Sequence, residues 1–155
     1  MAYATQADLV PLRLTQKDLA ELTVDDPLVD PASVAGQQIT ASVTSAALEE
    51  ASGRVESYCR MRYITPLQQS DDVKALTLDI AVYILFSRRR ETQITETVQQ
   101  RFDQAIGFLK DIAAARASLD QPATSVQPQT SLGGPEISNK DRNMQFSDRN
   151  LEGFV

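Results

Sequence analysis

The sequence predicts an all-α protein, with a small antiparallel helical domain that has short N-terminal helices (residues 1–119) and a long extended C-terminal tail (residues 120–155). Three observations predict this fold. Apolar residues recur at helical spacing in three long segments after residue 40. Two Thr-x-x-Asp sequences precede these segments and are typical of helix starts. After residue 119 the helical pattern ends, and Pro, Gly, Gln, Ser and Thr become frequent.

Two short helices are expected near the N-terminus. Asp8 follows Thr5 and Asp18 follows Thr15 by three residues, a weak capping box in which Asp replaces the usual Glu or Gln. Residues 23–40 then predict an acidic surface loop, because prolines, a glycine and carboxylates interrupt any helical stripe. These residues are Asp25, Asp26, Pro27, Asp30, Pro31 and Gly36.

Three main helices follow, which suit an antiparallel helical domain. Their expected bounds are about 41–63, 72–90 and 96–117. The second segment is apolar around nearly its whole circumference, which is typical of a central helix covered by its own domain or by a neighbouring copy. Asp71 or Asp72 is expected to cap this helix, and Thr95 or Thr97 begins the next.

The helical stripes also predict the core. Its members recur at steps of three and four residues, and the aromatic side chains among them are spaced as core residues rather than as a stacking platform. The predicted core holds Leu48, Val55, Tyr58, Leu76, Ile80, Ile84, Phe102, Ile106, Leu109 and Ile112, and Tyr83 and Phe108 are assigned to it on the same spacing.

The last residues of the tail become apolar again. Proline and glycine prevent a helix through the first half of the tail, so this half cannot pack a core by itself. A purely solvated tail would rarely end on large apolar side chains, so we expect this end to dock on partners, with a charge-assisted contact from Arg149. The expected docking residues are Phe146, Arg149, Leu151, Phe154 and Val155.

The composition argues against an enzyme. The chain has no histidine, one cysteine (Cys59) and a formal net charge of −6. These counts exclude histidine-based catalysis, a Ser-His-Asp triad, zinc sites of the His/Cys type and an intrachain disulfide. No phosphate-binding glycine motif occurs, so we expect no catalytic, cofactor-binding or metal-binding residues. The acidic balance also argues against a broad nucleic-acid-binding face.

Two charged clusters are candidate sites. Asp25, Asp26 and Asp30 lack the glycine and the distal glutamate of a calcium loop, so a solvated loop is the preferred interpretation. The basic run Arg88, Arg89 and Arg90 suits a helix C-terminus, where cations are favoured. An inter-subunit contact with carboxylates and a transient contact with DNA stay open for this run. The absence of a secretory signal and of an apolar span of about 20 residues predicts a soluble protein made in a cytosol.

Several segments, in this order and spacing, resemble the small Mu-like phage neck proteins over nearly the whole chain. They are Tyr3-Ala4-Thr5-Gln6-Ala7-Asp8-Leu9, Glu21-Leu22-Thr23, Ala47-Leu48-x-x-Ala51-Ser52-x-x-Val55-x-Ser57-Tyr58, Arg62-Tyr63-x-x-Pro66-Leu67, Leu78-Asp79-Ile80-Ala81-x-Tyr83-x-Leu85, Arg101-Phe102-Asp103-x-Ala105-Ile106-x-Phe108-Leu109 and Leu151-Glu152-Gly153-Phe154. The chain departs from the family at Ala115-Arg116, where the family commonly has a glycine, so a different helix ending is expected there.

The resemblance implies a helical head–tail connector, or adaptor, of the virion neck. Such a protein forms a ring, expectedly of twelve copies, beneath the portal protein and above a tail-side neck protein, without catalytic or metal residues. Genome DNA would pass through the ring as cargo, and a negative lumen would let it slide. The alternatives are a neck stopper or tail-completion protein and a non-viral helical interaction module.

Overall fold

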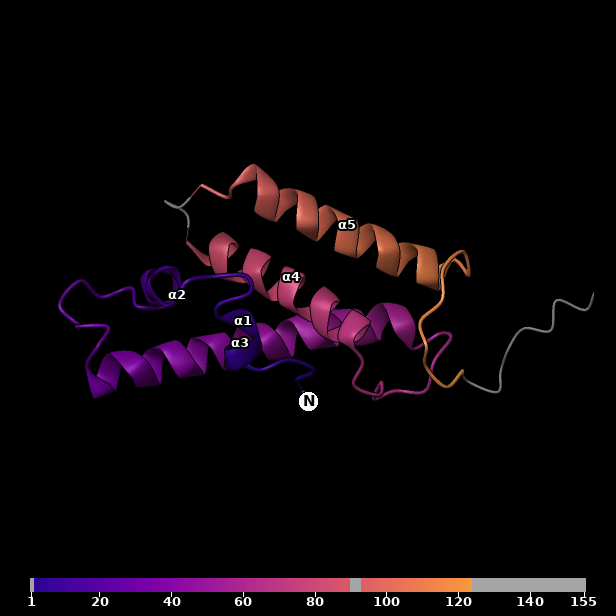
Figure 1. The fold of residues 1–155 in the computed structure, drawn as a ribbon, viewed down its shortest axis with the longest axis horizontal. Helices are drawn as coiled ribbons and strands as arrows, with labels where there is room; N and C mark the ends of the chain where they lie inside the picture. Colours follow the sequence, from indigo (N-terminus) through magenta and orange to yellow (C-terminus); the bar gives the residue numbers. More distant parts are fainter. Residues whose placement is uncertain (1, 90–92, 124–155) are drawn as a thin grey trace, which may run out of the picture.

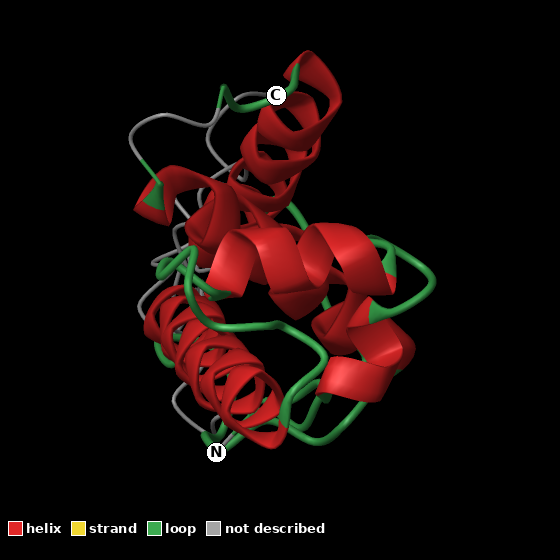
Figure 2. Cartoon of the chain, turned by 90° about the vertical axis from the view of Figure 1, so that its left-hand side faces the viewer, coloured by secondary structure: helices red, strands yellow, loops and turns green. Residues whose placement is uncertain are grey.

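The computed structural model describes residues 2–89 and 93–123, and its regular secondary structure in that part is helical. Its described residues contain no β-strand, only an isolated bridge between Tyr63 and Ala123 (Figure 2). The all-α prediction is confirmed. The helices are α1 (Gln6–Leu9), α2 (Gln16–Thr23), α3 (Val34–Cys59), α4 (Asp71–Arg88) and α5 (Glu96–Ala113).

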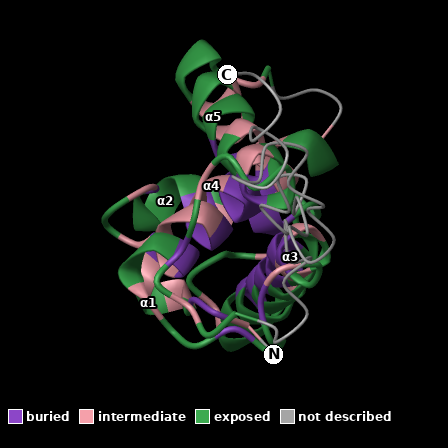
Figure 3. Ribbon diagram, turned by 90° about the vertical axis from the view of Figure 1, so that its right-hand side faces the viewer, coloured by how far each residue is buried: buried purple, intermediate pink, exposed green. Residues whose placement is uncertain are grey.

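Helix α4 is the centre of the fold, as its all-round apolar character predicts. It packs against α3 on one side and α5 on the other, while α1 and α2 lie against α3 (Figure 1). Ile80, Ala81 and Leu85 of α4 are fully buried, and buried residues are concentrated where α3 and α4 face each other (Figure 3). The domain itself therefore covers much of the apolar surface of α4.

The two N-terminal helices begin where the capping boxes predict. The Thr5 amide donates to Asp8 Oδ2 at 2.9 Å, and the Asp18 amide donates to Thr15 Oγ1 at 3.1 Å. Both helices are short, but Leu9 and Leu19 are fully buried against the longer helices. The sequence interpretation omitted these leucines from the core, because so short a segment shows no measurable helical period.

The prediction of a loop over residues 23–40 is wrong for residues 34–40, because α3 already begins at Val34. Ser33 caps the helix by accepting a hydrogen bond from the Gly36 amide at 3.0 Å. Gly36 is not a break. A Cβ at this position would lie 2.4 Å from the Asp30 carbonyl oxygen, so glycine lets the preceding loop cross close to the helix.

The other helix bounds lie within a few residues of the predicted ones, with one correction at a cap. Ser70, rather than Asp71 or Asp72, caps α4 by accepting from the Val73 amide at 3.4 Å, and the two aspartates occupy the first turn. Carboxylates are favoured there by the helix dipole. Thr95 precedes α5 as predicted.

The predicted core is confirmed for five residues and is partly right for five more. Leu48, Val55, Ile80, Leu109 and Ile112 are buried. The partly buried residues that pack against the core are Tyr58, Leu76, Ile84, Phe102 and Ile106. The Tyr83 ring stacks on Phe102 with centroids 3.8 Å apart, whereas Phe108 is 37% exposed, so its assignment to the core is wrong.

Helix α5 ends with a residue in the left-handed conformation, so the different helix ending expected from the departure at Ala115 is not seen. Ala115 has a φ of 62°, the left-handed region that glycine adopts at little cost. The Arg116 and Ala117 amides both donate to the Asp111 carbonyl oxygen, at 2.8 and 3.2 Å, and so satisfy a carbonyl of the last turn. The chain therefore adopts a glycine-type cap with an alanine.

Candidate interaction surfaces

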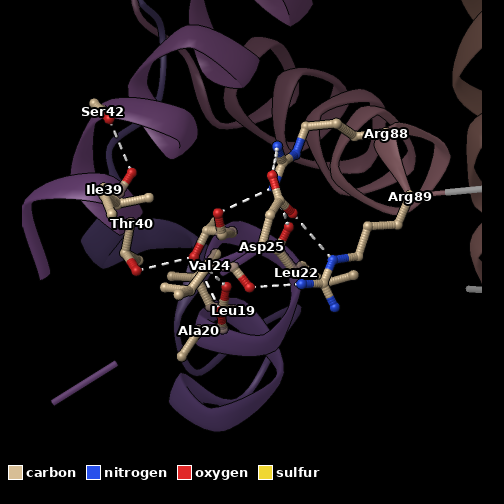
Figure 4. Close-up of polar contacts among 11 residues, drawn as sticks. Leu19, Ala20, Leu22, Val24, Asp25, Ile39, Thr40, Ser42, Arg88 and Arg89 are labelled. Atoms are coloured by element: carbon tan, nitrogen blue, oxygen red, sulfur yellow. Dashed lines mark hydrogen bonds and ion pairs between the residues drawn. The ribbon is translucent and has the colours of Figure 1, made fainter. Parts of the chain in front are cut away.

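Two consecutive arginines at the end of α4 hold the carboxylate that follows α2 (Figure 4). Arg88 Nη1 and Nη2 donate to Asp25 Oδ2 and Oδ1 at 2.6 and 2.7 Å, a bidentate pair. Arg88 Nη2 also donates to the carbonyl oxygens of Leu22 and Thr23 at 3.0 Å. Arg89 donates to Asp25 and to the Val24 carbonyl oxygen.

This arginine–aspartate cluster satisfies the last carbonyls of α2, which have no partner inside their own helix. Hydrogen bonds from the Arg88 guanidinium hold the pKa of Asp25 below its ordinary value. The sequence interpretation placed Arg88 and Arg89 at a helix C-terminus, where they lie, but it missed Asp25 as their partner within the chain. Their contact with a neighbouring subunit stays a prediction, and Arg90 lies outside the described residues.

A second polar cluster anchors the N-terminal segment. The Tyr3 hydroxyl donates to Glu56 Oε1 and accepts from the Leu67 amide at 2.8 Å, and the Tyr3 amide donates to Ser52 Oγ at 3.1 Å. Burial, together with the bond to Glu56, raises the pKa of Tyr3 to about 12. The hydroxyl therefore joins the N-terminus, α3 and the segment after α3, and it stays protonated at neutral pH.

The described chain ends against the segment that follows α3. The Leu119 amide donates to the Tyr63 hydroxyl at 2.7 Å, and the Ile64 amide donates to the Pro122 carbonyl oxygen at 3.2 Å. Gln121 exchanges hydrogen bonds with the Gln68 backbone at 2.8 and 2.9 Å. The first residues of the predicted tail, 120–123, thus contact the helical domain of their own chain.

The docking residues predicted in the tail lie beyond this point. Residues 124–155 are outside the described part, so the structure does not test the docking role of the predicted set or the division of the chain at residue 119. This set is Phe146, Arg149, Leu151, Phe154 and Val155.

Large apolar side chains reach solvent at several places on the described surface. Leu28, in the loop before α3, is 91% exposed, and Val34, the first residue of α3, is 74% exposed. Met61 and Ile64, after the end of α3, are 75% and 53% exposed. A hollow of about 1060 Å³ lies between α2 and the first half of α3. Its walls combine apolar residues such as Ala20 and Val34 with glutamines and with the charged residues Lys17, Glu21 and Asp30. Exposed apolar side chains that lie close together are typical of contacts with other macromolecules.

The acidic loop is organised by its own backbone. Asp26 Oδ1 accepts from the Leu28 amide and Asp30 Oδ1 from the Ala32 amide, both at 2.9 Å. Over residues 2–89 and 93–123, three or more His, Cys, Asp or Glu side chains nowhere gather in a way that could hold a metal ion. Cys59 is buried, and burial raises the pKa of its thiol to about 11. None of the described helices combines the length and apolar character needed to cross a membrane.

The chain was compared with known protein families. A family model described as Bacteriophage Mu, Gp36 matches residues 3–135, which is most of the chain. No curated protein matches the chain.

Proposed function

The chain belongs to the bacteriophage Mu Gp36 family, and we propose that this phage protein is a structural head–tail connector, or adaptor. In this proposal several copies, expectedly twelve, form a ring beneath the portal protein in the neck of the virion. The ring passes the genome onward and contacts a tail-side neck protein. Family membership makes the chain a phage protein and removes the alternative of a non-viral helical module.

The observation that carries the proposal is the exposure of large apolar side chains on a well-packed helical body. Leu28, Val34 and Met61 are each at least 74% exposed, although the same body buries Leu9, Ile80 and Leu109 completely. Burying a side chain of this size contributes about 1.5–3 kcal/mol. Exposed apolar residues on a body with a complete core are explained best by partners that cover them in an assembly.

The overall charge agrees with a role as a conduit rather than a DNA-binding protein. The net charge of −6 repels phosphate, so a ring of such chains would let DNA pass without holding it. Asp25 of the same chain partly neutralises the positive charges of Arg88 and Arg89. Their basic run therefore gives little support to stable binding of DNA.

Docking on the portal is assigned to the end of the tail. Phe146, Leu151 and Phe154 are large apolar residues in a segment rich in polar residues. Each would contribute about 1.5–3 kcal/mol by burial in a partner groove, before the cost of ordering the segment is subtracted. We expect deletion of residues 144–155 to abolish portal binding while leaving the unfolding temperature of the helical body unchanged.

The test is co-assembly with the portal protein of the same phage, followed by mass measurement of the complex. The proposal expects the chain to join the portal as a ring with defined stoichiometry. A chain that binds only a tail-side neck protein would instead support the stopper or tail-completion alternative. A chain that joins neither protein would overturn the proposal.

A further inference from the structure

The two ends of α3 carry exposed apolar side chains with flanking charges of opposite sign. We define the acidic patch as Asp26, Leu28, Asp30 and Val34, and the basic patch as Arg60, Met61, Arg62 and Ile64. The 26 residues of α3 separate the two patches by about 39 Å at 1.5 Å per residue. The loops that hold them lie at opposite ends of the long axis of the molecule (Figure 1).

Neither patch is neutralised within the described part of the chain. Each carboxylate of the acidic patch accepts one backbone amide of its own loop, and none of the ion pairs among the described residues includes Asp26 or Asp30. Arg60 is likewise in none of these ion pairs. Arg62 donates to the carbonyl oxygens of Ile112 and Ala117, so its charge also lacks a carboxylate among the described residues.

The surface beside the acidic patch carries no charge along the first half of α3. Residues 34–48, the first half of α3, include no charged residue, although much of the outer face of this half is exposed. The hollow between α2 and α3 opens here, with Asp30, Pro31 and Val34 in its wall. Solvated helix faces normally carry charges, so an uncharged exposed face beside this hollow indicates a covered surface.

We infer that the acidic patch of one copy binds the basic patch of a second copy of this chain. Met61 and Ile64 of one copy pack against Leu28 and Val34 of the next. Arg60 of the first copy faces Asp26 and Asp30 of the second. Methionine fills irregular apolar hollows well because its side chain is flexible. This inference deepens the proposed function, because it names the surfaces by which the copies of a ring would meet.

A second copy is favoured over another partner because each chain carries both halves of the contact. A head-to-tail interface requires two different complementary patches on every subunit, and repeated contacts of this type close into a ring when the rotation allows it. The opposite charges orient the two patches, and like charges would repel two acidic or two basic ends. A partner of another kind would explain one patch but not the pairing of both.

The experiment is a charge exchange across the contact. Met61→Glu places a carboxylate against Asp26 and Asp30, and Leu28→Lys places an ammonium against Arg60, so each variant should raise the dissociation constant for self-association about a hundredfold. The double variant restores an attractive pair and should regain association. Leu12→Glu is the matched control, since Leu12 is 67% exposed and lies outside both patches.

Sedimentation of the full chain over a range of concentrations and salt measures these effects, and thermal unfolding checks that every variant is folded. A wild type that stays monomeric at the highest soluble concentration would overturn the inference. So would single variants that associate as the wild type does, or a double variant that stays dissociated. Portal binding is measured separately: self-association without any portal binding contradicts the proposed function and leaves this inference standing.

Discussion

Arg88, in the last turn of α4, closes on Asp25, just after α2, through two hydrogen bonds of 2.6 and 2.7 Å. The two residues are 63 positions apart in the sequence, and their pairing joins the end of the central helix to the end of a short peripheral one. The same guanidinium also satisfies two carbonyls of α2. The pair therefore fixes where the loop before α3 begins.

Arg88→Ala should destabilise the folded chain by about 1–2 kcal/mol, mostly through the unpaired carbonyls of Leu22 and Thr23. Asp25→Asn should cost less, about 0.5 kcal/mol, because the Asp25 side chain is 59% exposed and solvent screens the ion pair. Chemical denaturation measures both values. Arg54→Ala is the control, since among the described residues Arg54 pairs with Glu50 alone, on the surface of its own helix. Equal losses for Arg88→Ala and Arg54→Ala would contradict this role.

The carboxylate of Asp8, in the capping box of α1, should contribute to the pH dependence of the free energy of unfolding. Hydrogen bonds from Thr5, and then from Lys74, lower the pKa of Asp8 to about 2. A carboxyl with a lowered folded pKa stabilises the fold above its unfolded pKa, and this contribution is lost as the pH falls toward the folded pKa. Stability should thus decrease between about pH 4 and pH 2.

Asp8→Asn isolates this contribution. The variant should have lower stability at neutral pH and a flatter decrease between about pH 4 and pH 2 than the wild type. Unfolding curves at a series of pH values provide the measurement. Glu49→Gln is a suitable control, because Glu49 is exposed in the middle of α3, away from the helix ends, and belongs to none of the ion pairs found among the described residues. An unchanged pH profile for Asp8→Asn would show that this carboxylate does not contribute.

The end of α5 offers a stabilising substitution. Ala115 has a φ of 62°, where a Cβ costs about 1–2 kcal/mol. Ala115→Gly removes this strain and loses part of the gain to the greater entropy of the unfolded glycine, so it should stabilise the chain by about 0.5–1 kcal/mol. Ala105→Gly, inside the same helix, should destabilise it. A lower unfolding temperature for Ala115→Gly would contradict the observed backbone conformation.

The long helices were predictable because their apolar stripes persist over many turns. The centre of α4 around Ile80 and the start of α5 after Thr95 are both local patterns that a sequence displays directly. The start of α3 was not predictable, because proline and glycine, here Pro31 and Gly36, are typical of loops. Their role becomes clear only when the close crossing of Asp30 over the helix is seen.

The candidate surfaces were less predictable than the helices, for a physical reason. The pairing of Arg88 with Asp25 depends on how α2 packs against α4, and no local rule gives the partner of a side chain 63 residues away. The exposure of Met61 likewise follows from α3 ending at Cys59 rather than continuing to residue 63. A helical pattern in the sequence identifies the apolar residues but does not show which of them stay exposed to solvent.

The core should be most sensitive to substitution at the centre of α4. Ile80 is fully buried in the central helix α4, so Ile80→Ala removes apolar contacts and leaves a cavity, which should cost about 2–5 kcal/mol. Leu28→Ala is the matched control, because Leu28 is 91% exposed and its truncation leaves no cavity in the folded monomer. Denaturation of dilute, monomeric protein keeps the effect on folding apart from any effect on assembly. A loss below about 1 kcal/mol for Ile80→Ala would contradict its burial, since even a single buried methylene contributes about 0.8 kcal/mol.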